Sequence, residues 1–344
     1  MKYTSKIVDG HLDIAWNWQS LGREFASSVV EKAKADSDEV REAEGTAAVG
    51  LPELIRGNFG VVVGSLWVEP SNSAQPTLGK KYRNLAEARR MALEQLDYYY
   101  EQARHDHVRL ILSRQDLVEV LLRDGLVGIA LAIEGADFLR GPEDLDFWYS
   151  KGVRLVGPVW QANAYGGCSV LGGPLTSQGR RLLAAMAELG MILDIAHMSQ
   201  ECADDALDFF NGVAVSSHSA CRMLSPGERQ TSDSQVRKIH ESGGIIGMML
   251  WDRVINPGRA RVDLDHLWLH LVRVQGLVGG WDSVGLGTSL DGGFGTESLP
   301  EGMADIGDCS KIGTYLLGKE VAARDVEKVM YRKWGRVLLS AYDE

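Results

Sequence analysis

The chain has 344 residues, of which 45% are hydrophobic and 24% are charged, with 39 Gly and only 9 Pro. This composition excludes a disordered chain, a collagen and a coiled coil, and the length suits one α/β barrel. The net charge is −11 and there is no basic block, which argues against nucleic acid or an anionic membrane surface as the main partner. A chain of this length can bury a large core without disulfides or structural metals.

The cysteines and the amino terminus bear on the compartment. Cys168, Cys202, Cys221 and Cys309 show no CxxC spacing and are too few for a disulfide scaffold, so we expect buried free thiols in a reducing compartment. The amino-terminal MKYTSKIVDGHLDIAW lacks the apolar core of a signal peptide. No apolar run reaches the roughly 18–20 residues of a membrane span. These features predict a cytoplasmic protein.

Short apolar, β-branched runs alternate along the chain with longer amphipathic segments, which is typical of βαβ units. Several runs are continuously apolar (VVVGSLW, VGIALAI, GIIGMML), as in parallel strands that are buried on both faces. In chain order, the predicted elements are a strand at 6–13, a charged, Ala-rich helical insertion at 19–53, a strand at 60–67, a polar loop at 70–81, a helix at 85–104, strands at 126–134 and 153–160, a helix at 178–189, a strand at 191–197, a helix at 201–210, a strand at 213–218, a helix at 233–241, a strand at 244–250, a helix at 263–275, a strand at 284–289 and a helix at 323–341.

Eight strands, nearly all followed by a helix, predict a TIM-type (β/α)8 barrel with the insertion over one end. A further apolar run at 108–112 would make a ninth strand. The alternative is an open, doubly wound sheet, but its usual G-x-G-x-x-G after the first strand is absent. No break in composition marks a second domain, so we expect one barrel domain over residues 1–344.

Candidate metal ligands follow the predicted strands, at the end of the barrel where its chemistry lies. The first strand ends in His11-Leu12-Asp13, the third in Glu134, the fifth in His197 and the sixth in His218. Residues i and i+2 of a strand point to the same side, so His11 and Asp13 can bind one ion. Imidazoles and carboxylates without thiolates suit two Zn²⁺ or similar divalent ions. Such a pair would activate a bridging water and polarise a carbonyl, which is metal-assisted hydrolysis.

The motifs VDGHLDIAW, AIEGAD, DIAHMS and SSHSAC, taken together, resemble the membrane (renal) dipeptidase family, the M19 metallopeptidases of the amidohydrolase-like barrels. The resemblance covers almost the whole chain. It implies that His11 and Asp13 bind one metal, that Glu134 bridges both metals, and that His197 and His218 bind the second. It also implies a binuclear zinc enzyme that cleaves a dipeptide or a related small amide through a metal-bridging water.

The resemblance extends to the expected substrate contacts. GERQTSD is similar to the family's R-N-x-x-D stretch and places Arg229 where an arginine binds the substrate carboxylate. A planar, bidentate cation suits that role. Trp160 and Asn163, in VRLVGPVWQAN, stand where the family's fourth strand approaches the substrate. Family members commonly form homodimers, which the resemblance implies here as well.

Two positions depart from the family pattern. Trp160 replaces a histidine that contacts the substrate, and Ser289, in VGLGTSLDGG, replaces an aspartate that handles protons. A serine has no useful basicity at neutral pH, and a positioned acid/base is worth about 10²–10⁴ in rate. Asp291 is the remaining candidate acid/base; its alternative role is to cap the loop before Gly292. A catalytically weak or inactive relative that binds metal and a small ligand is therefore the second hypothesis, and a barrel without metal is the third.

Overall fold

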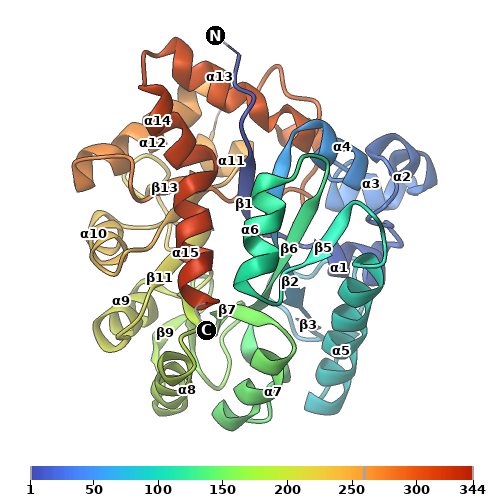
Figure 1. The fold of residues 1–344 in the computed structure, drawn as a ribbon. Helices are drawn as coiled ribbons and strands as arrows, with labels where there is room; N and C mark the ends of the chain where they lie inside the picture. The colour runs from blue at the N-terminus through green and yellow to red at the C-terminus, as the bar shows by residue number, and fades with distance from the viewer. Residues whose placement is uncertain (1, 259–260, 343–344) are drawn as a thin grey trace.

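The computed structural model describes residues 2–258 and 261–342, and its central feature is a ring of parallel strands surrounded by helices (Figure 1). The ring consists of β1 (Ile7–Leu12), β2 (Phe59–Trp67), β6 (Val127–Glu134), β7 (Val153–Gly157), β10 (Ile192–Asp194), β11 (Ala214–Ser219), β12 (Ile246–Met248) and β13 (Val284–Leu286). Pairing of β1 with β13 and of β2 with β6 closes the ring. The predicted (β/α)8 barrel is confirmed, and each predicted strand has its counterpart.

Several short strands lie outside the ring. The apolar run at 108–112 forms β5 (Val108–Leu110), which pairs with the start of β6 and does not interrupt the closed barrel. The polar loop at 70–81 is flanked by the paired β3 (Glu69–Pro70) and β4 (Lys81–Tyr82). An antiparallel hairpin of β8 (Gly166–Cys168) and β9 (Gly172–Leu175) follows β7 and was not predicted.

The helices surround the barrel. They are α5 (Leu85–Gln102), α6 (Arg114–Leu122), α7 (Leu145–Ser150), α8 (Ser177–Glu188), α9 (Gln200–Phe209), α10 (Asp233–Glu241), α11 (Asp252–Ile255), α12 (Leu264–Val278), α13 (Ser310–Gly318), α14 (Ala323–Glu327) and α15 (Lys333–Ala341). The predicted helices are confirmed, although the last is divided by a π-helical turn, Lys328–Arg332. Serine side chains cap the amino termini of α9 and α10: Ser199 accepts a hydrogen bond from Cys202 N, and Ser232 accepts one from Gln235 N.

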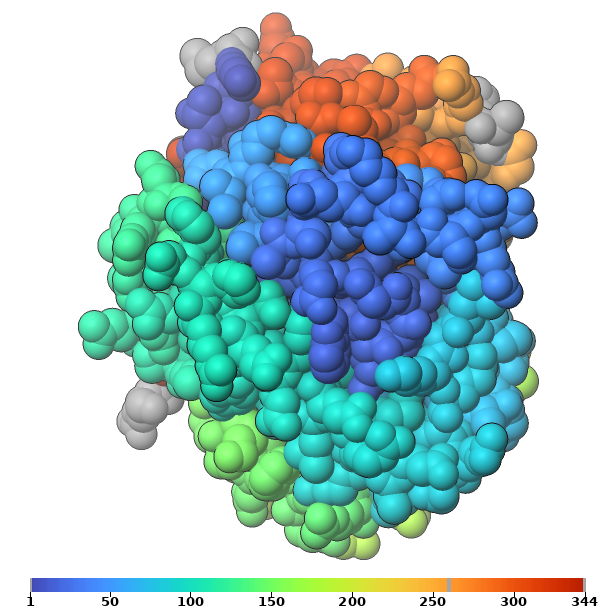
Figure 2. Space-filling view, turned by 90° about the vertical axis from the view of Figure 1, so that its right-hand side faces the viewer, coloured from blue at the N-terminus to red at the C-terminus, as the bar shows by residue number. Residues whose placement is uncertain are grey.

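The predicted insertion contains α2 (Val29–Ala35), α3 (Asp38–Glu44) and α4 (Leu51–Arg56). It contacts the loop after β13, because Ala48 N and Val49 N donate to the Asp291 carboxylate at 2.7 and 3.0 Å. Figure 2 shows the dark blue insertion between the cyan segment and the orange carboxyl-terminal part. The insertion therefore lies over the end of the barrel at which the strands finish.

The opposite end of the barrel is closed by α15, which lies in front of the strands in Figure 1. One buried cluster joins this helix to side chains of most barrel strands: Val8, Val61, Ala130, Leu155, Ile192, Val215, Trp334, Val337 and Leu338. The Trp334 indole is fully buried and its Nε1 donates to Leu286 O at 2.8 Å. Gly10 and Gly285 face this ring, and a Cβ at either position would collide with it. This end is thus a packed and satisfied core.

All four cysteines belong to the described part of the chain, where they are buried and unpaired, as predicted. Across residues 2–258 and 261–342, no helix combines the length and the apolar character needed to cross a bilayer.

Candidate metal centre

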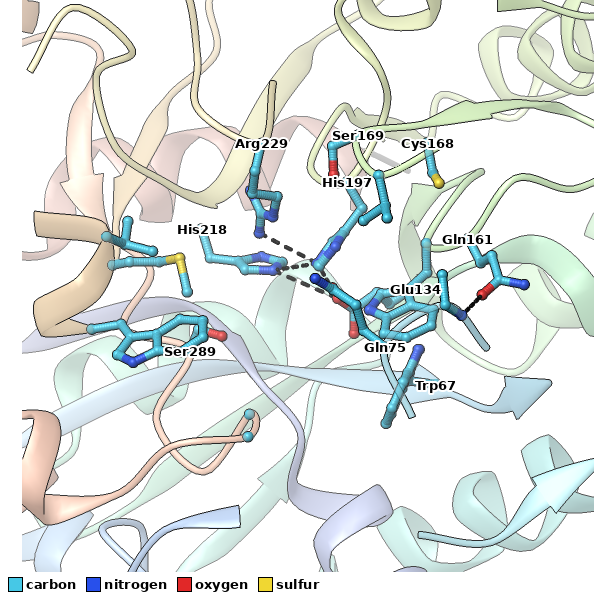
Figure 3. A pocket seen from close by; sticks show the side chains of 18 of the residues that line it. Trp67, Gln75, Glu134, Gln161, Cys168, Ser169, His197, His218, Arg229 and Ser289 are labelled. Atoms are coloured by element: carbon cyan, nitrogen blue, oxygen red, sulfur yellow. Dashed lines mark hydrogen bonds and ion pairs between the residues drawn. The ribbon is translucent and has the colours of Figure 1, made fainter. Parts of the chain in front are cut away.

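The five predicted ligands meet at the carboxyl end of the strands, around the Glu134 carboxylate. Figure 3 shows three of them, Glu134, His197 and His218. On one side, His11 Nε2 lies 3.4 Å from Asp13 Oδ2 and 3.4 Å from Glu134 Oε2. On the other side, Glu134 Oε1 lies 2.9 Å from His197 Nε2 and 3.5 Å from His218 Nε2. The two oxygens of the Glu134 carboxylate therefore belong to two different groups of candidate ligand atoms.

The two groups are close to each other as well as to Glu134. The His11 and His218 rings stack with centroids 3.8 Å apart. Ligand atoms of His11, Glu134 and His218 all lie within 4.8 Å of one another. We call the His11, Asp13 and Glu134 Oε2 set the first ligand group, and the His197, His218 and Glu134 Oε1 set the second ligand group.

Hydrogen bonds orient the imidazoles of the second ligand group. Ser217 Oγ donates to the Asp194 carboxylate, so it accepts from His218 Nδ1, 2.7 Å away. This leaves a lone pair on His218 Nε2. Arg229 Nη2 donates to His197 Nε2 at 3.3 Å, so this nitrogen is also an acceptor. Such partners commonly fix the tautomer of a metal-binding histidine.

The second ligand group brings acceptor atoms of three side chains close together. His197 Nε2 and His218 Nε2 are 2.9 Å apart, and both face Glu134 Oε1. In the first ligand group, His11 Nε2 is buried and has no hydrogen-bond partner among the described residues. Buried acceptors that face one another are costly unless a cation lies between them. The residues therefore fit divalent metal ions, and their donor set of imidazole and carboxylate without thiolate suits zinc.

Burial and neighbouring charges shift the pKa values of the ligands. Burial lowers the pKa of His197 and of His218 well below the usual value, so both rings are neutral at pH 7. Burial raises the pKa of Glu134 to about 7. For His11, the attraction of Glu134 and Asp13 outweighs burial and raises its pKa, while burial of Asp13 is outweighed by His11, which lowers the Asp13 pKa. Metal binding must displace a proton from this cluster.

Two residues at the site have a left-handed backbone that side chains rarely adopt. The φ angle is 68° at His197 and 56° at Ser289. Backbone strain of this kind is usually associated with function and costs of the order of 1–3 kcal/mol per residue. Backbone hydrogen bonds hold both conformations: Ser169 N donates to His197 O at 2.8 Å, and Ser289 N donates to His11 O at 3.2 Å.

A cavity of about 610 Å³ lies over the ligands, and its walls include Arg229, Trp160 and Ser289. Arg229 is half-buried, but its Nη1 atom is buried and finds no acceptor within the described structure; burial lowers the pKa of Arg229 to about 10, so it remains a cation. A Cβ at Gly292 would lie 2.9 Å from Asp13 Oδ2 and 3.0 Å from Ser289 Oγ. The Ser289 hydroxyl therefore lies beside the first ligand group, at a point where only glycine fits next to it.

Two predicted site residues are not brought to the cavity. The Asp291 carboxylate is engaged by the amides of Ala48 and Val49, so the structure gives it the loop-capping role rather than access to the ligands. Asn163 Nδ2 donates to Asp137 Oδ2 and to Pro158 O, so the Asn163 side chain stabilises the loop in which it lies. Neither side chain is among those that line the cavity in the described residues.

Some cavity residues were missed by the sequence analysis. Trp67 ends β2 and Trp251 follows β12, and both line the cavity. Both lie at the ends of predicted strands, the second and the seventh, as the candidate ligands do, and this position is the signal that identifies them. Asp194 and Ser217, which hold His218, left no signal beyond their place at strand ends.

Comparison with known proteins identifies the family. The family model described as membrane dipeptidase, peptidase family M19, matches residues 1–343. An uncharacterized dipeptidase of Schizosaccharomyces pombe is 27% identical over 322 residues, covering 89% of this chain and 72% of its own. Dipeptidase tcpJ of Claviceps purpurea is 25% identical over 304 residues, covering 86% and 69% of the two chains.

Solved structures show the same fold. A metallo peptidase from Rhodobacter sphaeroides, liganded with a phosphinate mimic of L-Ala-D-Ala, superposes with a TM-score of 0.80 at 22% identity, covering 98% of this chain and 99% of that one. A dipeptidase described as a metallo peptidase of family M19 gives a TM-score of 0.81 with the same identity and coverage. The chain belongs to the membrane dipeptidase family of metallopeptidases, peptidase family M19.

Proposed function

We propose that this protein is a binuclear metal-dependent dipeptidase that hydrolyses the amide bond of a dipeptide or a related small amide. The proposal rests on the position of the Glu134 carboxylate: its Oε2 belongs to the first ligand group and its Oε1 to the second. The family match and the dipeptide mimic bound to the Rhodobacter sphaeroides relative support the same substrate class.

His11 and Asp13 would hold one ion, His197 and His218 the other, and Glu134 would bind both. Two divalent ions, which we take to be zinc from the donor set, would supply Lewis acidity for a carbonyl and would lower the pKa of water. The chain itself holds the His218 imidazole in the metal-binding tautomer through Ser217. Arg229 donates to His197 Nε2 here and would give up that nitrogen to the ion. The chain also excludes bulk water, because His11, Glu134 and His218 are all buried.

Arg229 is the proposed anchor for the substrate carboxylate. Its Nη1 is buried without an acceptor in the described part of the chain, while Nη2 already donates to His197. A carboxylate would supply the missing acceptor and neutralise a buried charge. This places the carboxyl-terminal residue of a dipeptide next to the second ligand group.

Ser289 and Trp160 set the chemistry available beside the ligands. The Ser289 hydroxyl lines the cavity and can donate one hydrogen bond to a substrate or water, but it cannot hold a transferred proton. The Trp160 indole, centred 6.0 Å from the His197 ring, offers a flat apolar face in place of a titratable side chain. The two side chains can thus orient a substrate without moving its protons.

The direct test is a panel of dipeptides offered to the zinc-loaded protein, to the chelator-treated protein and to Glu134→Gln. We expect hydrolysis that disappears with the chelator, returns on adding zinc and is absent from Glu134→Gln. No turnover of any dipeptide by the fully loaded protein would refute the proposal.

A second function is favoured by one observation: the Asp291 carboxylate binds the insertion, so it does not take the place of the family aspartate that Ser289 replaces. In this hypothesis the protein binds metal and a small ligand but catalyses weakly or not at all. Ser289→Asp combined with Trp160→His would then raise dipeptide hydrolysis by about 10²–10⁴-fold, the usual worth of a positioned acid/base. Unchanged activity in the double variant would show that these positions are not the defect.

The resemblance also leads us to propose a homodimer. Light scattering on the purified protein gives the mass directly, and a mass near 37.7 kDa, that of one chain, would exclude it.

A further inference from the structure

A row of aromatic rings leads away from the second ligand group along one wall of the cavity. The Trp160 ring centroid lies 6.0 Å from that of His197 and 4.8 Å from that of Trp67. The Trp67 ring in turn lies 5.1 Å from that of Trp16. The three indoles follow β7, β2 and β1, so three separate strand ends place them side by side. We call Trp16, Trp67 and Trp160 the tryptophan wall.

The tryptophan wall carries an unused hydrogen-bond donor. Trp67 is only 5% exposed, and its Nε1 has no acceptor within the residues described. Figure 3 shows Trp67 next to Gln75 and Glu134 in the wall of the cavity. A buried donor without a partner is unfavourable, whereas the Trp334 N–H at the other end of the barrel has its acceptor. The Trp67 N–H therefore indicates a ligand that brings an acceptor to this wall.

The wall lies on the far side of the ligands from Arg229. In Figure 3, Arg229 and Trp67 are on opposite sides of Glu134 and His197. If Arg229 holds the carboxylate of a dipeptide, as in the proposed function on which this step rests, the amino-terminal residue extends toward the tryptophan wall. The side chain of that residue is then the group that the three indoles contact.

The surroundings of the wall are uncharged. Ala74, Pro76 and Val170 also line the cavity, together with the neutral polar residues Gln75, Thr77 and Gln161. Its carboxylates are Asp13 and Glu134, which belong to the ligand groups, and Glu228, which adjoins Arg229 in sequence. The loop at 70–81 is tied in place, because Ala74 N donates to Gln161 Oε1 at 2.8 Å. A neutral, flat side chain fits this wall better than a charged or a small one.

We propose that the tryptophan wall is the pocket for the amino-terminal residue of the substrate and that it selects an aromatic side chain. Stacking on Trp160 and Trp67 provides the selection over small side chains. The Trp67 N–H adds a preference for a ring that carries an oxygen acceptor, so the expected order is Tyr, then Phe, then Ala.

The test compares Tyr-Ala, Phe-Ala and Ala-Ala as substrates of the zinc-loaded protein. We expect kcat/KM for Phe-Ala to exceed that for Ala-Ala by roughly tenfold or more, as for an apolar group that fills a pocket. Trp160→Ala removes most of this difference, and Trp160→Phe, which keeps an aromatic ring and protects the fold, retains it. Trp67→Phe, which lacks the indole N–H, abolishes the preference for Tyr over Phe. Trp268→Ala, an indole of α12 outside the cavity, is the matched control and leaves the order unchanged.

Calorimetry with phosphinate mimics of Phe-Ala and Ala-Ala measures the same selection without turnover. Tighter binding of the Phe-Ala mimic to the wild type, lost in Trp160→Ala, supports the pocket even if no dipeptide is hydrolysed, in which case only the proposed function fails. Equal affinities for the two mimics, or hydrolysis of Ala-Ala as fast as that of Phe-Ala, would overturn the pocket while leaving the dipeptidase proposal intact.

Discussion

The two ends of the barrel use the same strands in opposite ways. At the amino end of the strands, α15 inserts Trp334 among small and branched side chains, and its N–H is satisfied by Leu286. At the carboxyl end, the Nε2 atoms of His197 and His218 and the Glu134 carboxylate face one another at short distance. The closed end is built for stability, whereas the open end is unfavourable until a cation joins it.

The backbone repeats this contrast. At the closed end, Gly10 and Gly285 make room for the Trp334 ring without backbone strain. At the open end, His197 and Ser289 adopt left-handed conformations although neither is glycine. Backbone strain is thus found at the candidate metal centre and not at the packed end, as is usual where strain is associated with function. Mutations at the two ends should therefore separate stability from metal binding.

The largest effect is expected from Glu134→Gln, which removes the charge that both ligand groups share. We expect loss of bound metal and a fall in any dipeptidase activity of roughly 10³-fold or more, beyond the loss of a single oxyanion donor. Elemental analysis and kinetics measure the two effects. Glu228→Gln, which neutralises another carboxylate of the cavity, is the control and keeps its metal. A fully metallated Glu134→Gln would contradict the account.

Trp334→Ala should have its effect at the closed end alone. Removal of the fully buried indole is expected to lower the free energy of unfolding by about 3–5 kcal/mol. Urea denaturation measures this change, and the folded variant should bind as many ions as the wild type. Loss of metal without a loss of stability would show that the two ends are not separable.

Ser217→Ala tests the orientation of His218. Without the hydroxyl between Asp194 and His218 Nδ1, the ring loses the partner that fixes its tautomer. Metal affinity should fall by about 10- to 100-fold, measured by competition with a chromogenic chelator. Ser216→Ala is the matched control, because the Ser216 hydroxyl contacts Thr231 and not a ligand. Equal metal affinities of Ser217→Ala and Ser216→Ala would show that the Ser217 hydroxyl does not contribute to metal binding.

The smallest change concerns pH. Burial raises the pKa of Glu134 to about 7, and neighbouring carboxylates raise that of His11 against the effect of burial. Protons held by these groups compete with metal, so affinity should fall as the pH drops through about 7. The expected slope is up to about tenfold per pH unit for each proton displaced. Affinities that do not change between about pH 6 and pH 8 would show that the ligands bind metal without losing protons.

The barrel, and the grouping of the five candidate ligands at one end of it, could be predicted because both depend on local patterns: apolar strands, and the polar residues that directly follow them. Prediction failed where the chain leaves a strand. Asp291 was the candidate acid/base at the end of the eighth predicted strand, but β13 ends at Leu286, and both Ser289 and Asp291 have positive φ angles. The hairpin of β8 and β9, which is rich in glycine, and the closure by Trp334 depend on long-range contacts that no local pattern reveals.

The central claim is that Glu134 joins two metal sites, and the most direct measurement is the number of divalent ions bound per chain. Metal-depleted protein titrated with zinc in a calorimeter, with elemental analysis of the product, gives this number. The account predicts about two ions per chain in the wild type, as in other two-metal sites, and loss of both in Glu134→Gln. A wild-type protein that binds one ion or none, or a Glu134→Gln variant that still binds two, would contradict it.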